Sequence, residues 1–275
     1  MADLKTLSAK IQDYLKEHPK DYAECVVGLQ KIRDDDFSAL HPETNPVILN
    51  MEGYDARQLA FVIVEYSAFS NEAIHMLVDA MIRDHDWELL KKEIEHNIAE
   101  EKGQETKGIP HLEMMRQGYR LDLKLETDGV RNSAVTVSFL EKMRNIFKHD
   151  DNAFSAGALL AFEGTAIDEF HVLDRIVREY KARLGGDLKK GSLTNLYIDG
   201  HKDFEIGHEA GLRDSIAPYI NADNIHRFIR GYFSVCLTMN TWWEQLAHET
   251  YFRMTYHELS VSDTEIFDVS AVFEK

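Results

Sequence analysis

The chain has 275 residues, of which 44% are hydrophobic, enough for one large domain or two small ones with a buried core. Its 48 acidic and 31 basic residues give a net charge of −17. This charge repels phosphate backbones and anionic lipids, so we exclude nucleic acids and membranes and expect a small molecule or another protein as partner.

The amino-terminal segment and the cysteines narrow the class further. The segment is amphipathic and charged, and no run of 18 apolar residues occurs, so we expect neither a signal peptide nor a membrane span and place the protein in the cytoplasm. Cys25 and Cys236 are too few for a disulfide framework or a thiolate metal site. A metal would be bound by His, Asp and Glu, which suits iron, manganese or zinc.

Apolar residues recur three and four positions apart over most of the chain, which is the helical period. The clearest stretches are residues 59–82, 138–147, 154–180 and 225–252. Helix-breaking residues fall at 41–46, 102–110, 127–129, 184–192 and 217–224. We therefore predict a single all-α domain over residues 1–275 with about seven to nine helices, a core near 55–250 and a loose acidic tail at 258–275.

Two of the acids in this helical pattern stand at a helix end. In the sequence NIAEEKG, Glu100 and Glu101 fall in the last turn of a helix that ends at Gly103. Acids there interact unfavourably with the helix dipole. One of the two can be a solvated surface charge, but the other suggests a further role. His111 follows at the start of the next helix, where a short loop can fold it back toward Glu101.

Glu163 lies further along, in the sequence AGALLAFEGTAI, among small and apolar residues. The helix face that carries it is expected to pack inside the protein. A buried carboxylate without a partner costs several kcal/mol, and a cation removes that cost. A buried Arg or His is the alternative partner.

The stretch YIDGHKDFEIGH contains the spacing His-x3-acid-x2-His, formed once in the chain by His201, Glu205 and His208. On a helix of 3.6 residues per turn these positions lie within roughly 60° of one another, so the side chains point to one place. A metal ion requires that convergence, but a solvated stripe on a helix surface has the same period. Spacing alone leaves both interpretations open.

In this order, NIAEEKG with its following histidine, the glutamate in ALLAFEG, YIDGHKDFEIGH and CLTMNTWWEQL resemble the haem-oxygenase-like diiron oxidase superfamily. The resemblance covers about residues 55–250 and rests on short motifs in the right order. It implies a haem-oxygenase-like helical bundle that binds two iron ions. The ligands that it implies are His111, Glu163, His201, Glu205 and His208, with Glu101, or Glu100 in another register, as a mobile catalytic carboxylate.

The superfamily also has an acid on its first core helix. Glu72 is our preferred equivalent, and Glu65 lies two turns earlier on a similar face. His75 is close enough to Glu72 to support it or to bind metal itself. Glu205 stands where the superfamily usually has Asp, and its longer side chain can bridge two ions differently.

The implied chemistry is that of an oxidase or oxygenase that activates O2 at two iron ions, with manganese as another metal that these ligands accept. The carboxylates of Glu72, Glu101, Glu163 and Glu205 would balance the charge of two ferrous ions. N-oxygenation, desaturation and oxidative C–C cleavage are the expected reaction types. An external electron donor and a homodimeric assembly are further expectations.

Residues near the ligands suggest the substrate class. Tyr197 is expected as a second catalytic residue that orients a ligand or lines the pocket, and Arg213 as a holder of a substrate carboxylate. Several superfamily members act on free amino acids, so we expect an amino acid or an amino-acid derivative. Four phenylalanines predict an apolar chamber, although each can equally belong to the core: Phe61, Phe69, Phe162 and Phe170.

Two other classes of protein stay open. A ferritin-like four-helix carboxylate protein would use Glu72 with His75 and Glu205 with His208 as paired Glu-x-x-His motifs, without His201. A metal-free helical binding or interaction protein would keep the same histidines solvated or hydrogen bonded.

Overall fold

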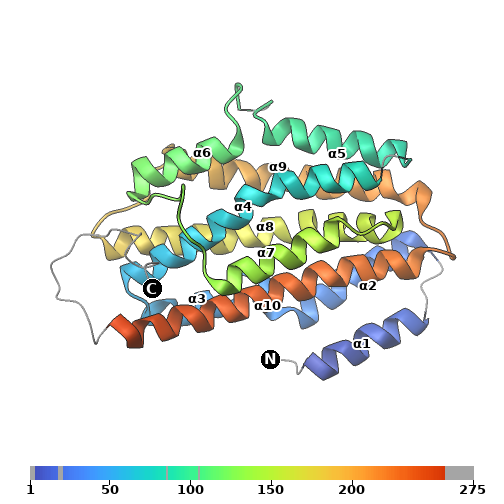
Figure 1. The fold of residues 1–275 in the computed structure, drawn as a ribbon, viewed down its shortest axis with the longest axis horizontal. Helices are drawn as coiled ribbons and strands as arrows, with labels where there is room; N and C mark the ends of the chain where they lie inside the picture. Colours follow the sequence, from blue (N-terminus) through green and yellow to red (C-terminus); the bar gives the residue numbers. More distant parts are fainter. Residues whose placement is uncertain (1–3, 18–20, 85, 105, 258–275) are drawn as a thin grey trace.

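The computed structural model describes residues 4–17, 21–84, 86–104 and 106–257 (Figure 1). Within these ranges the chain forms ten α-helices and no β-strand, which confirms the predicted all-α class. The helices are α1 (Leu4–Glu17), α2 (Tyr22–Asp36), α3 (Pro46–Asn50), α4 (Ala56–Arg83), α5 (Glu88–Glu101), α6 (His111–Gly118), α7 (Ala134–Phe147), α8 (Asn152–Arg183), α9 (Leu193–Ile216) and α10 (Ile225–His257).

The number of helices exceeds the expected seven to nine because periodicity cannot detect a helix as short as α3, which has five residues. Among the residues described, no helix combines the length and apolarity that a bilayer crossing requires. The expected loose tail, residues 258–275, lies outside the described ranges.

Local side-chain contacts fix where the long helices begin. Asp55 and Gln58 form a capping box at α4, each side chain bonding to the backbone N–H of the other. Ser133 caps α7, and Asp151 caps α8 by accepting a 2.9 Å hydrogen bond from the Phe154 N–H. These caps set the rotation at which each helix enters the bundle, and so help to decide which side chains face inward.

Helix α8 lies at the centre of the bundle and contacts α4, α9 and α10 (Figure 1). Helices α5 and α6 pack on α9 at one side, and α1, α2 and α7 contact α10 at the other. The apolar core is therefore distributed along both sides of α8. The interior between α8 and α9 also carries the buried polar residues described below.

The backbones of α8 and α10 meet at two glycines. A Cβ atom on Gly157 would lie 1.9 Å from the carbonyl oxygen of Phe228. A Cβ atom on Gly231 would lie 1.8 Å from the carbonyl oxygen of Phe154. The contact is reciprocal, and since both nearest atoms belong to the backbone, no side-chain rotation can make room. Any larger residue must separate the two helices.

We expect Gly157→Ala to lower the free energy of unfolding by about 1–3 kcal/mol, because overpacking outweighs the better helix propensity of alanine. Urea denaturation monitored by circular dichroism measures this change. Gly207→Ala is the control, since a Cβ atom there meets nothing within 4 Å in α9. It should raise stability by about 0.5–1 kcal/mol. Equal effects of the two substitutions would contradict the close approach.

Candidate metal centre

Six side chains from four helices meet around one cavity, in two groups of three. Within each group, the oxygen and nitrogen atoms that can bind a metal all lie within 4.8 Å of one another. Helix α9 contributes to both groups, one residue to the first and two to the second. The first group is Glu101, His111 and His201, and the second is Glu163, Glu205 and His208.

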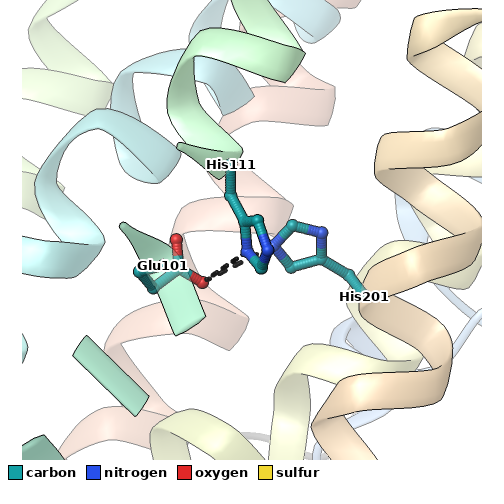
Figure 2. Close-up of side chains that lie close together, drawn as sticks. All are labelled: Glu101, His111 and His201. Carbon is teal, nitrogen blue, oxygen red and sulfur yellow. Dashed lines mark hydrogen bonds and ion pairs between the residues drawn. The ribbon is translucent and has the colours of Figure 1, made fainter. Parts of the chain in front are cut away.

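In the first group, His111 from α6 and His201 from α9 converge on Glu101 at the end of α5 (Figure 2). Glu101 Oε1 lies 3.2 Å from His111 Nδ1 and 3.6 Å from His201 Nε2. The backbone carbonyl of Tyr197, 2.8 Å from His201 Nδ1, can only accept a hydrogen bond. Nδ1 therefore carries the proton, which leaves the lone pair of Nε2 directed at the group.

The turn between α5 and α6 brings Glu101 and His111 together. Gly103 has a φ of +98°, and a Cβ atom there would lie 2.6 Å from the backbone carbonyl of Ile109. The Gly108 N–H donates a 2.8 Å hydrogen bond to the Gly103 carbonyl. Only glycine meets both the conformational and the steric requirement at position 103. The short loop thus returns the chain as expected from the sequence.

The second group surrounds the imidazole of His208. Its Nδ1 atom lies 3.3 Å from Glu205 Oε2 and 3.5 Å from Glu163 Oε2. Its Nε2 atom makes a close contact with a carboxylate oxygen of Glu100 on the opposite side of the ring. A carboxylate that holds one nitrogen of an imidazole leaves the other nitrogen available as a metal ligand. Glu100 and Glu101 therefore serve different groups.

Burial and neighbouring charges shift the pKa values of three of these side chains in the metal-free chain. Burial, together with the charge of Glu163, raises the pKa of Glu205 well above its usual range. Although burial opposes it, hydrogen bonds and charges from Glu163 and Glu205 raise the pKa of His208 to about 12. In the other group, burial acts to raise the pKa of Glu101, but His111 and His201 hold it well below its usual range. The second group therefore stabilises positive charge on His208, and the first group stabilises the ionised carboxylate of Glu101.

The donor set fits two divalent metal ions. It offers three imidazoles and three carboxylates, a mixture of nitrogen and hard oxygen ligands that suits iron or manganese. His111 Nε2 is buried and has no hydrogen-bond partner, as expected for a nitrogen atom that binds a metal ion. The six residues are the predicted ligands apart from Glu72. Metal binding itself stays a prediction.

Asn97 belongs to this site although its side chain was not singled out from the sequence. It is fully buried on α5, lines the cavity, and its Nδ2 atom donates to Glu163 Oε1 at 3.4 Å. Its Oδ1 atom has no partner. Asn97 stands one turn before Glu101 on the same helix face, and that spacing was the available signal. Its amide orients the Glu163 carboxylate.

The structure does not bring Glu72, our preferred first-helix acid, to the two groups or to the cavity. Its carboxylate pairs with Arg144, 2.6 Å away on α7, and this guanidinium lowers the pKa of Glu72. The face of α4 that lines the cavity carries Tyr66, Phe69, Ser70, Ala73 and Leu77. Glu72 is one position from Ala73, and about 100° per residue turns it away from the cavity.

The alternatives on α4 lie elsewhere too. Glu65 is buried, but it accepts hydrogen bonds from the backbone N–H and the hydroxyl of Ser133 at the start of α7, at 3.0 and 3.1 Å. His75 is exposed and does not line the cavity. The paired Glu-x-x-His arrangement of a ferritin-like protein is not formed, because neither Glu72 nor His75 reaches Glu205 and His208.

The expected substrate residues divide in the same way. Phe162 lines the cavity, as do Phe69 and Phe170, whereas Phe61 is core. Tyr197 also lines it, and its hydroxyl donates to the Ser70 hydroxyl at 3.3 Å. Arg213 lies apart from this cavity. Its side chain is about half exposed, lies 3.9 Å from Asp214 and is absent from the cavity lining, because it follows His208 by five residues and therefore points to another face.

Glu169 is a cavity residue that the sequence reasoning missed. It is buried on α8 and lines the same cavity as the two groups. It stands seven residues after Phe162 and immediately before Phe170, so the helical stripe formed by those two rings predicts its orientation. Acid–histidine spacing could not find it, because Glu169 has no histidine three residues later.

The fold and the two histidine–carboxylate groups define a protein of the haem-oxygenase-like class. The model of a family described as a domain of unknown function with a solved structure, DUF3865, matches residues 24–249, and the chain belongs to this family. No curated protein matches the chain.

Two crystal structures of a CADD-like protein of unknown function from Nostoc punctiforme PCC 73102 are similar to the chain. One has a TM-score of 0.78 and 27% sequence identity, and the match covers 83% of this chain and 98% of that one. The other has a TM-score of 0.76 and 25% identity, and covers 88% and 99%. The similarity supports the fold and leaves the chemistry to be argued from the site.

We expect Glu205→Gln to raise the melting temperature of the metal-free protein, because it removes a carboxyl group whose ionisation is disfavoured beside Glu163. The same change should abolish the stabilisation of the wild type by Mn²⁺, since binding to the folded state alone raises stability. Differential scanning fluorimetry with a chelator and then with excess Mn²⁺ measures both effects.

Glu72→Gln is the matched control, because it removes a carboxylate that pairs with Arg144 outside the cavity. It should keep the full Mn²⁺ shift. If Glu205→Gln kept the shift and Glu72→Gln lost it, the assignment of the second group would be wrong.

Proposed function

We propose that the protein is a non-haem diiron oxidase or oxygenase that uses O2 to oxidise a small organic substrate, an amino acid or an amino-acid derivative. The observation that carries this proposal is the pair of histidine–carboxylate groups that face one cavity with aromatic walls. Five of their six side chains are buried, so little water would compete for the ligand atoms.

The proposed ligands are Glu101, His111 and His201 for one ion and Glu163, Glu205 and His208 for the other. When bound, the two irons would supply the coordination sites and the electrons for O2 activation. Glu100, in contact with His208, is a fourth carboxylate close to the site. Four carboxylates would balance the charge of two ferrous ions, and Glu100 would supply the negative charge that was expected from Glu72.

The residues of the chain position these ligands and exclude water. The carbonyl of Tyr197 fixes the ring of His201 through Nδ1, and Glu100 holds Nε2 of His208. Asn97 holds one oxygen of Glu163. Glu101 is the most exposed of the six ligands, next to the turn at Gly103, and is therefore the carboxylate best placed to change its contacts when substrate enters.

A metal-free binding protein is less well supported. Such a protein would satisfy its buried polar atoms internally, yet His111 Nε2 and Asn97 Oδ1 have no partner. In such a protein, burying two acids, Glu163 and Glu205, beside the single imidazole of His208 would cost stability and serve no function. These costs have a reason if cations occupy the site.

We expect the wild type to bind about two ferrous ions per chain under anaerobic conditions, and Glu163→Ala or His208→Ala to abolish iron binding, because each removes a ligand from the second group. His75→Ala, an exposed histidine on α4, is the control and should bind as the wild type does. Iron content after gel filtration measures the effect. Full iron content in either ligand variant would refute the assignment.

The same reconstituted protein tests the activity. Mixing it with O2 in a stopped-flow spectrophotometer, with a panel of amino acids, should give a transient visible absorbance that at least one amino acid accelerates or quenches. Iron binding without any response to O2 across the panel would argue for a binding protein instead.

A further inference from the structure

Glu169 is a buried acid in the cavity, and no described residue forms a salt bridge with it. Its residue exposure is 1%, and its Oε1 atom makes no hydrogen bond. It lines the cavity from α8, in the part of the wall that carries Tyr66 and Phe170. Neither of the two proposed metal groups includes it. The fold therefore keeps in this cavity a carboxyl group with one oxygen free of hydrogen bonds.

The groups around Glu169 do not satisfy it. The Tyr66 hydroxyl lies 3.5 Å from Oε2, a long hydrogen bond. The indole of Trp243 and the hydroxyl of Tyr66 both act to lower the pKa of Glu169. The indole N–H nevertheless forms no hydrogen bond. Burial nevertheless raises the pKa of Glu169 to about 8. A buried carboxyl group in this condition gains most from a ligand that brings positive charge or N–H donors.

The rest of the cavity wall determines which ligand fits. Among the described residues that line the cavity, none is Lys or Arg. A substrate carboxylate would find positive charge only at the two metal groups, on bound ions or on His208, which Glu163 and Glu205 already pair. An ammonium group, by contrast, has Glu169 as a counter-charge, and the rings of Tyr66 and Phe170 line the same cavity. Phe69 and Phe162 complete an apolar surface for the remainder of the molecule.

We propose that Glu169 binds the amino group of the substrate, so that the cavity selects amines with an apolar or aromatic body over alcohols and acids of the same shape. The amine would be oriented toward the metal groups, and this consequence rests on the proposed function. The selectivity itself belongs to the cavity and can be measured without iron.

The test uses the full chain, first metal-free and then loaded with Mn²⁺, and three probes of equal body and different charge: 2-phenylethylamine, 2-phenylethanol and phenylacetate. Isothermal titration calorimetry should show the tightest binding for the amine. Glu169→Gln should weaken amine binding by roughly 10- to 100-fold, the range of a charge-assisted hydrogen bond, and leave the alcohol unchanged. Glu179→Gln, on the same helix but paired with Arg183 at the surface, should leave all three affinities unchanged.

Three results would overturn the proposal. They are equal amine affinity in the wild type and Glu169→Gln, tighter binding of phenylacetate or phenylethanol than of the amine, and no binding of the amine by the wild type. A purely structural role would change the melting temperature of Glu169→Gln without changing the ranking of the probes.

Iron loading separates this test from that of the proposed function. Glu169→Gln should bind ferrous iron as the wild type does. If amine selectivity depends on Glu169 but the wild type binds no iron, the proposed function fails and the amine site stands. If iron binds and the selectivity is absent, only the amine site fails.

Discussion

Charge compensation inside the bundle is the constraint on which the site depends. Glu163 and Glu205 face the imidazole of His208 between α8 and α9, where few water molecules can screen them. In the metal-free chain a proton on His208 offsets part of this charge. Replacing one partner by an apolar residue would leave the others unpaired, so the members act as a unit. The bundle therefore gives up stability in this layer to keep these polar side chains inside, a trade that is common at functional sites.

The two halves of the site are supported differently. Helix α8, which carries Glu163 and Glu169, is held against α10 by the backbone contact at Gly157 and Gly231. The other half rests on Glu101, at the end of α5, and on His111, across the turn that follows. Side chains fixed on packed helices, combined with one carboxylate beside a turn, allow the geometry of the two groups to adjust without repacking of the core.

Side chains that share one helix were predictable, and side chains whose position depends on helix rotation were not. The spacing of His201, Glu205 and His208 fixes their convergence once the segment is helical, and the short loop after Glu101 limits where His111 can lie. Spacing could not place Glu72, because the inward face of α4 is set by its packing on α5, α7 and α8, which puts Ala73 and not Glu72 at the cavity. The all-α class followed from periodicity alone.

The acids at the end of α5 explain why this helix tolerates charge that its own dipole opposes. Glu100 contacts Nε2 of His208 and Glu101 contacts both His111 and His201, so each acid has imidazole partners that the helix end itself does not provide. At Gly211, on α9, a Cβ atom would lie 1.8 Å from the carboxylate of Glu93, so α5 and α9 approach closely enough for these contacts to form. A carboxylate bonded to one nitrogen of an imidazole raises the basicity of the other nitrogen of that ring. Negative charge from Glu100 thus acts on the second group through the ring of His208 and not by direct contact with Glu163 or Glu205.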